Sequence, residues 1–164
     1  MKRLIIPECY ADTELLLQLN FFRKQIVHHG VQGKGEVKNL LEKRADENQP
    51  GIGIIDDDTK SKGIIRPPRF FQDFDIYHKR NNLIICHKPN TRVFLIKIIP
   101  RLEEWIIKAS NKQHINPADY DLPNSGDELH ESLSYRTMPT EFIELINDLK
   151  RIKGNYLKTL RNMV

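Results

Sequence analysis

The amino-acid sequence predicts an α/β fold: a Rossmann-like, mainly parallel sheet, built from a βαβαβ unit plus an added pair of strands, flanked by helices and followed by C-terminal helices. Short apolar runs of strand length alternate with longer segments of helical period over the first third of the chain, which is the pattern of βαβ units. The chain has 164 residues, of which 39% are hydrophobic and 29% charged, a balance that suits one globular domain. In such a fold the crossovers are right-handed and ligands bind beyond the carboxyl ends of the strands.

Three apolar runs supply the strands of the βαβαβ unit, at residues 3–6, 25–29 and 52–55. Each run has the length of a buried parallel strand. Asp12 or Thr13 is expected to cap the helix after the first strand, because a short polar side chain accepts a hydrogen bond from the first helical turn. A second helix is expected over residues 36–45, where apolar side chains recur on one stripe.

The rest of the chain predicts the added strand pair and more helices. Residues 82–87 and 92–99 are strand-like runs separated by a hairpin-like turn, and residues 101–110 follow as a helix. A capping box formed by Ser125 and Glu128 then begins helices that continue to the end of the sequence.

The domain organisation and compartment follow from composition. We expect residues 1–110 to form the α/β core and residues 111–164 to form a helical extension packed on the same domain. No stretch approaches the roughly 18 apolar residues that a membrane helix needs. The two cysteines, Cys9 and Cys86, do not form a Cys-x-x-Cys pair, which argues against a disulfide framework and a structural zinc site. We therefore expect a cytoplasmic protein that makes no membrane contact.

Charge is segregated along the chain, although the net charge is only +4. Residues 59–101 hold 10 basic and 2 acidic residues (+8), and residues 149–164 hold 5 basic and no acidic residues (+5). Residues 1–58 (−2) and 102–148 (−7) are acidic. The two basic segments either form a surface that attracts phosphate, since Lys and Arg contacts release counterions from nucleic acid, or are simply solvated faces.

Acidic residues follow two of the expected strands. Glu8 comes after the first strand, and Asp56, Asp57 and Asp58 come directly after the third. In a sheet of order 2-1-3 these strand ends are neighbours, and alternation lets Asp56 and Asp58 face one way while Asp57 faces the other. Aspartates also commonly begin turns, which is the alternative explanation. Three adjacent aspartates repel one another, however, unless a cation or basic side chains compensate their charge. Because carboxylates, water and phosphate oxygens are the ligands of Mg²⁺ and Mn²⁺, we predict a site for one of these ions.

These residues resemble the Toprim domain of topoisomerases, primases, OLD-type nucleases and small stand-alone bacterial proteins. Glu8-Cys9-Tyr10-Ala11-Asp12 after an apolar run is similar to the Toprim motif Glu-Gly-x-x-Asp, and Asp56-Asp57-Asp58 is similar to its Asp-x-Asp motif. The glycine turn within residues 30–37 looks like the turn after strand two of the stand-alone proteins. The segment around Glu103 and Trp105 is similar to a Phe-Glu-x-Trp-like element of RloB-like proteins. The resemblance covers residues 3–60 and extends more weakly to residue 110.

The Toprim resemblance implies roles for individual residues. Glu8 would act as general base in cleavage or general acid in rejoining, with Asp12 as the second catalytic residue. Asp56 and Asp58, with Glu8 and Glu103, would hold Mg²⁺ or Mn²⁺. Cys9 stands where the family has glycine, which affects how closely a substrate approaches the backbone. A strand-passing topoisomerase also needs a tyrosine nucleophile in a further domain, so the resemblance favours a nuclease that acts on DNA or RNA.

Cations near the acidic residues are candidate phosphate contacts. They are Lys34, Lys60, Lys62, Arg66 and Arg69. The run from Arg66 to Phe71 mixes cations and aromatic rings as surfaces that bind single strands do. The alternative is a packed loop in which Phe70, Phe71 and Phe74 cover the sheet.

Two further motifs are incomplete. Gly33-Lys34 is not a phosphate loop of the type Gly-x-x-x-x-Gly-Lys-Ser/Thr, because His28 and Gly35 stand where that motif has a glycine and a hydroxyl. His130-Glu131 is not a metalloprotease motif, because Ser134 replaces the second histidine.

The sequence therefore predicts a Mg²⁺-dependent enzyme that cleaves phosphodiester bonds in nucleic acid, as a homodimer or within a larger bacterial defence or repair complex. One alternative is a non-catalytic module that binds nucleic acid or protein through a degenerate Toprim site. A second alternative is a receiver-like phosphoacceptor, which has a parallel sheet and clustered aspartates. That class has an acidic pair after its first strand, where this chain has Glu8 alone.

Overall fold

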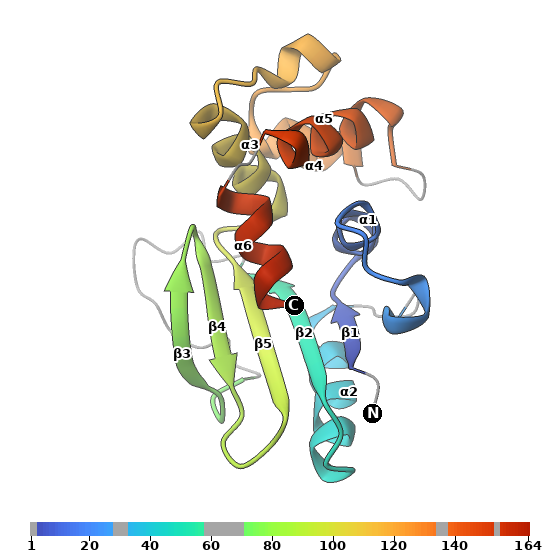
Figure 1. The fold of residues 1–164 in the computed structure, drawn as a ribbon, viewed down its shortest axis with the longest axis vertical. Coiled ribbons are helices and arrows are strands. Elements are labelled where there is room, and N and C mark those ends of the chain that lie inside the picture. The colour runs from blue at the N-terminus through green and yellow to red at the C-terminus, as the bar shows by residue number, and fades with distance from the viewer. Residues whose placement is uncertain (1–2, 28–32, 58–70, 134–137, 153–154) are drawn as a thin grey trace.

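A mixed five-stranded sheet forms the centre of the protein (Figure 1). The computed structural model describes residues 3–27, 33–57, 71–133, 138–152 and 155–164. Across the sheet the strands lie in the order β1 (Leu4–Pro7), β2 (Gly51–Asp56), β5 (Val93–Ile98), β4 (Leu83–His87) and β3 (Asp75–Arg80). The protein is thus of the predicted α/β class.

The sheet is mixed rather than mainly parallel, which corrects the prediction. Strand β2 pairs in parallel with both β1 and β5, whereas β5–β4 and β4–β3 are antiparallel. The expected strand pair is present as β4 and β5. Strand β3 was not expected, and it joins β4 through Asn81 and Asn82, whose φ values of 50° and 58° suit a two-residue hairpin turn.

The segment expected as strand two is only partly a strand. Residues Arg23–Gln25 form a 3₁₀ helix, η1, and Ile26 makes a single parallel bridge with Ile5. Val27 N donates to Ile5 O at 2.9 Å. Strand β2 pairs with one side of β1, and the bridge to Ile26 lies on the opposite side of β1. This is the side on which the predicted order 2-1-3 places the second strand. Residues 28–32 lie outside the described part of the chain.

Helices follow the apolar patterns with small changes at their starts. The described helices are α1 (Tyr10–Gln18), α2 (Lys34–Asp46), α3 (Leu102–Lys112), α4 (Gly126–Leu133), α5 (Thr140–Arg151) and α6 (Asn155–Met163), with a 3₁₀ helix η2 (Pro117–Tyr120). The N-cap of α1 is Cys9 rather than Asp12 or Thr13. Asp12 instead occupies the third helical position, where its Oδ2 accepts from Cys9 N at 3.2 Å and Cys9 Sγ at 3.3 Å. A capping box therefore begins this helix one turn earlier than predicted.

The helices lie on both faces of the sheet and beyond the carboxyl ends of its parallel strands, where α3, α4 and α5 gather (Figure 1). Helix α2 packs on one face around a core that contains Val37, Leu41, Ile55 and Leu95. The second core joins the other face of the sheet to α1, α3, α5 and α6, and it is continuous from Ile5 and Leu15 to Leu145 and Leu157. Alternation along the strands separates the two cores, since successive side chains point to opposite faces. No helix among the described residues is long and apolar enough to cross a membrane.

Candidate functional site

Glu8 and Asp56 meet at the carboxyl ends of β1 and β2. Glu8 N donates to Ile54 O at 2.9 Å, which continues the parallel ladder past the end of β1. Glu8 Oε2 in turn accepts from Asp56 N at 3.0 Å. The two acidic residues that the sequence placed after neighbouring strands are therefore in direct contact.

Asp56 also joins the sheet to helix α3. Its Oδ1 accepts from Leu102 N, the first residue of α3, at 2.9 Å. The N-cap of this helix, Arg101, contributes no side-chain cap, so Asp56 satisfies a backbone N–H that the helix cannot satisfy by itself. The positive end of the helix dipole also favours the negative charge of Asp56.

Asp12 is buried beside these acids, with 1% of its surface exposed. Its Oδ1 has no hydrogen-bond partner among the described residues. Burial raises the pKa of Asp12 to about 7, and the nearby charges of Glu8 and Glu103 act in the same direction. These electrostatic contributions show that Asp12, Glu8 and Glu103 share one neighbourhood.

Glu103 approaches the site from the first turn of α3 and is 4% exposed. Its Oε1 lies 2.9 Å from Nδ1 of His130 on α4. Its Oε2 has no hydrogen-bond partner among the described residues and lies 3.8 Å from Nε of Arg101. Because a carboxylate accepts, the proton of this bond belongs on His130 Nδ1. A buried acid thus holds a half-exposed histidine at the edge of the site.

Arg101 binds the acids of α3 and α4 together. It donates through Nε to Glu104 Oε2 at 2.7 Å and through Nη2 to Asp127 Oδ1. The hydrogen bond to Glu104 is the main reason why the pKa of Arg101 lies above its ordinary value. Sequence reasoning missed Arg101 and His130, because their neighbours come from a helix 26 and 27 residues away.

Asp57 faces away from this cluster, as alternation along the strand predicts. It forms an ion pair of 2.7 Å with Lys97 of β5, and both side chains are buried. Lys97 lies in register with Ile55 on the α2 side of the sheet. Asp58, which completes the predicted metal site, lies outside the described residues.

The structure thus brings four of the predicted site residues together: Glu8, Asp12, Asp56 and Glu103. Within the part of the chain that the structure describes, no three His, Cys, Asp or Glu side chains are grouped closely enough to hold a metal ion by themselves. The donors present are nonetheless carboxylate oxygens, and buried oxygens of Asp12 and Glu103 lack a hydrogen bond from any described residue. Mg²⁺ suits such a set, since it is usually held by one or two carboxylates together with water and substrate phosphate.

Of the five predicted phosphate contacts, only Lys34 is described. It is the first residue of α2 and is half-buried. Lys60, Lys62, Arg66 and Arg69 lie outside the described residues. Phe71 and Phe74 are buried and pack edge to face with their ring centroids 5.4 Å apart. These two rings therefore cover the sheet and do not form a surface for stacking bases.

In comparisons with known proteins, no family model matches this chain, and neither a curated protein nor a solved structure does. The Toprim resemblance therefore stays a prediction from short motifs. The function has to be argued from the carboxylate cluster itself.

Proposed function

We propose that this protein is a Mg²⁺- or Mn²⁺-dependent enzyme of Toprim type, with a Rossmann-like core, that cleaves phosphodiester bonds in DNA or RNA. The observation that carries the proposal is the cluster of Glu8, Asp12, Asp56 and Glu103 where parallel strands end. Ligand sites of α/β sheets lie at this edge. Burial of several acids in one place is costly unless a cation or a proton compensates their charge.

Glu8, Asp56 and Glu103, together with Asp58, would hold the cation. Bound there, it would neutralise the non-bridging oxygens of a phosphodiester and lower the pKa of a water molecule. Asp57 is not part of this set, because its charge is already balanced by Lys97.

Glu8 and Asp12 divide the proton transfers between them. Burial raises the pKa of Asp12 to about 7, so a substantial fraction of this carboxyl group keeps its proton near neutral pH and can donate it to the leaving oxygen. Glu8 follows the buried end of β1 but is itself only half-buried, so it is suited to accept the proton of the attacking water. Neighbouring carboxyl groups with different environments commonly take these opposite roles. Glu103, oriented by His130, keeps negative charge close to Asp12 and so supports the protonated form.

A cleavage assay on single-stranded DNA and RNA, with Mg²⁺, with Mn²⁺ and with EDTA, tests the proposal. Glu8→Gln keeps the acceptor for Asp56 N, so we expect a folded protein that loses about 10²-fold or more of the cleavage rate. Glu36→Gln on the exposed face of α2 is the matched control and should cleave like the wild type. Wild-type protein that cleaves no faster than Glu8→Gln with either metal would overturn the enzymatic proposal.

The competing proposal is a non-catalytic module with a degenerate site. The structural bonds of Glu8 and Asp56 favour it, because both carboxylates already accept backbone hydrogen bonds. Nucleic-acid binding without metal-dependent cleavage in the same assay would support this second proposal.

A further inference from the structure

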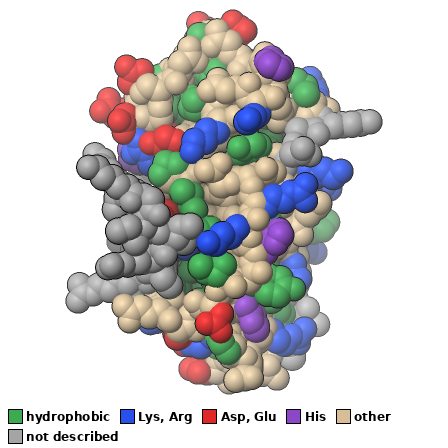
Figure 2. Space-filling model, turned by 90° about the vertical axis from the view of Figure 1, so that its left-hand side faces the viewer, with side chains coloured by type: hydrophobic (Ala, Val, Ile, Leu, Met, Phe, Trp, Pro, Cys, Tyr) green, Lys and Arg blue, Asp and Glu red, His purple; other side chains and the backbone are tan. Residues whose placement is uncertain are grey.

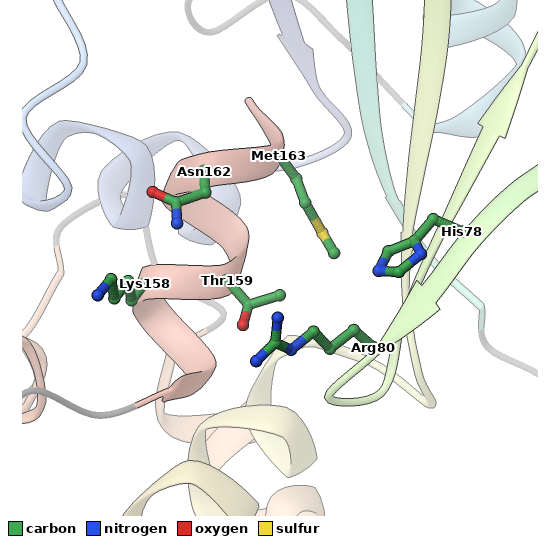
Figure 3. A pocket seen from close by; sticks show the side chains of 6 residues that line it. All are labelled: His78, Arg80, Lys158, Thr159, Asn162 and Met163. Atoms are coloured by element: carbon green, nitrogen blue, oxygen red, sulfur yellow. The ribbon is translucent and has the colours of Figure 1, made fainter.

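Strand β3 and helix α6 enclose a polar pocket on the side of the sheet that carries α6. The pocket has a volume of about 420 Å³ and is lined by His78, Arg80, Lys158, Thr159, Asn162 and Met163. Figure 3 shows His78 and Arg80 extending from β3 towards the helix, where Thr159 and Met163 face them. None of the carboxylates of the candidate site lines this pocket, so the pocket is separate from the site of Glu8 and Asp56.

The pocket joins the two basic segments of the sequence. His78 and Arg80 come from residues 59–101, and Lys158 comes from residues 149–164. Arg80 and Lys158 form no ion pair with any described residue, and no acidic side chain lines the pocket. Figure 2 shows the side of the molecule that carries β3, with Lys, Arg and His side chains spread across its middle. An arginine and a lysine that line one pocket without an acidic side chain in its lining attract an anion, and Arg presents the fork that phosphate oxygens fit.

The walls of the pocket are held in place by hydrogen bonds. Asn81 Nδ2 in the β3–β4 turn donates to Thr159 Oγ1 of α6 at 2.8 Å. Trp105 Nε1 donates to Asn81 O at 2.8 Å, and this indole is fully buried. The hairpin and α6 are therefore fixed to each other and to the core, which fixes the backbone positions from which Arg80 and Lys158 extend.

Aromatic rings continue the same face of the sheet beyond the pocket. Tyr77 is 72% exposed, and its ring centroid lies 6.3 Å from that of Phe94. Phe94 lies 4.7 Å from the ring of His87 and packs against the core that contains α6. In the described part of the chain, no helix lies in front of β3 and β4 on this face (Figure 1). An exposed tyrosine supported from behind by a second ring is a platform on which a base can stack.

We propose that this face, formed by Tyr77 and the pocket between β3 and α6, binds a single-stranded nucleic acid. One backbone phosphate binds in the pocket that Arg80 and Lys158 line, and a neighbouring base stacks on Tyr77. Charges alone would protect the edge strand β3 from pairing with other chains. Edge protection does not account for an exposed aromatic ring beside the charges. This binding site does not depend on the proposed cleavage reaction.

Fluorescence anisotropy with labelled 20-nucleotide oligothymidylate and oligouridylate, in EDTA and at several salt concentrations, tests this site without a metal. Arg80→Gln with Lys158→Gln should weaken binding at least tenfold at low salt. It should also reduce the slope of log K against log[salt] by about 1.4, the value for two lost contacts to a single strand. The control, Lys108→Gln with Lys112→Gln, removes the same charge from exposed positions of α3 and should change affinity less than twofold.

Tyrosine variants test the stacking step separately. Tyr77→Ala should weaken binding about tenfold with the salt slope unchanged, whereas Tyr77→Phe should bind like the wild type. Glu8→Gln should also bind like the wild type, so a failure of the proposed cleavage reaction leaves this result intact. The proposal would be refuted if the two charge-removing double variants lost equal affinity, or if Tyr77→Ala bound the oligonucleotides like the wild type. Failure of the wild type to bind either oligonucleotide, with a concentration-dependent dimer in ultracentrifugation, would instead assign the face to a second copy of the chain.

Discussion

Asp12 shows what a buried acid does at the scale of one residue. Its pKa is raised from 3.8 to about 7 by burial, so between these values the folded protein keeps a proton that the unfolded chain has lost. The stability that this proton supplies is complete below pH 3.8 and is lost as the pH rises to about 7. At alkaline pH the folded protein therefore carries the cost of a buried carboxylate.

The first prediction follows from the loss of stability that ionisation of Asp12 causes as the pH rises. Asp12→Asn keeps the shape of the side chain without its charge, so the variant should gain stability relative to the wild type as the pH rises from 4 to 8. Urea unfolding in EDTA, at several pH values, measures the difference. Asp119→Asn on the exposed surface of η2 should follow the wild-type curve. A gap between Asp12→Asn and the wild type that stays constant with pH would show that the fold does not raise the pKa of Asp12.

The second prediction concerns the buried pair of Lys97 and Asp57, whose side chains are 2% and 9% exposed. Lys97→Met leaves Asp57 charged without this partner, so the free energy of unfolding should fall by about 3–5 kcal/mol. Adding Asp57→Leu removes the second charge and should restore most of that loss. Denaturant titration measures both steps.

A surface pair provides the comparison for this experiment. Arg151 lies 3.0 Å from Asp148 and is 79% exposed, so Arg151→Met should cost less than about 1 kcal/mol. A loss for Lys97→Met as small as that for Arg151→Met would mean that Asp57 finds another partner or takes up a proton.

At the scale of elements, the packing of α2 on β2 depends on one glycine. A Cβ atom at Gly53 would lie 2.8 Å from side-chain carbons of both Leu41 and Val37 of α2. Helix and sheet can approach this closely only because the side chain is absent. The same contact places α2 firmly behind the strand that ends in Asp56.

The third prediction tests this close approach. Gly53→Ala should lower the free energy of unfolding by about 1–3 kcal/mol, because an overpacked core shifts its neighbours. Gly35→Ala in the first turn of α2 meets no atom within 4 Å, and should raise stability by up to about 1 kcal/mol. Differential scanning calorimetry should therefore show the two melting temperatures moving in opposite directions.

Several elements could be predicted because their signals are local. Strands β1 and β2 are apolar runs bounded by breaking residues, and α2 has its apolar residues on one stripe. Strand β3 could not be found by the same rule, since every residue of Asp75–Arg80 is exposed. Its signal was the Asn81-Asn82 turn, which favours positive φ values. The early start of α1 at Tyr10 depends on a cysteine cap, which propensity does not favour.

Some contacts of the candidate site could likewise be predicted from the sequence, and others could not. Glu8 and Asp56 could be placed together because neighbouring parallel strands end at one edge. The contact between Glu103 and His130 depends on how α3 packs on α4, and no spacing in the sequence reports it. Sequence patterns thus predict which residues meet at neighbouring strand ends, whereas side-chain contacts between helices can be found only from the structure.

At the scale of the whole molecule, one sheet carries two separate chemical surfaces. The ends of β1 and β2 gather carboxylates under α3, and the opposite edge strand, β3, gathers cations and an exposed aromatic ring beside α6. This separation gives physical meaning to the charge segregation of the sequence. We propose that the carboxylate surface binds a divalent cation and that the surface beside α6 binds single-stranded nucleic acid.

Calorimetric titration with Mn²⁺ tests the central claim, that the carboxylate cluster binds a divalent cation, most directly. Wild-type protein should bind about one ion per chain, since the proposed ligands form a single site. Glu8→Gln with Asp56→Asn keeps both backbone acceptors and should abolish binding. The control, Glu36→Gln with Asp46→Asn on the exposed face of α2, makes the same change in charge and should bind like the wild type. Absence of heat from the wild type, or equal binding by the two double variants, would contradict the account.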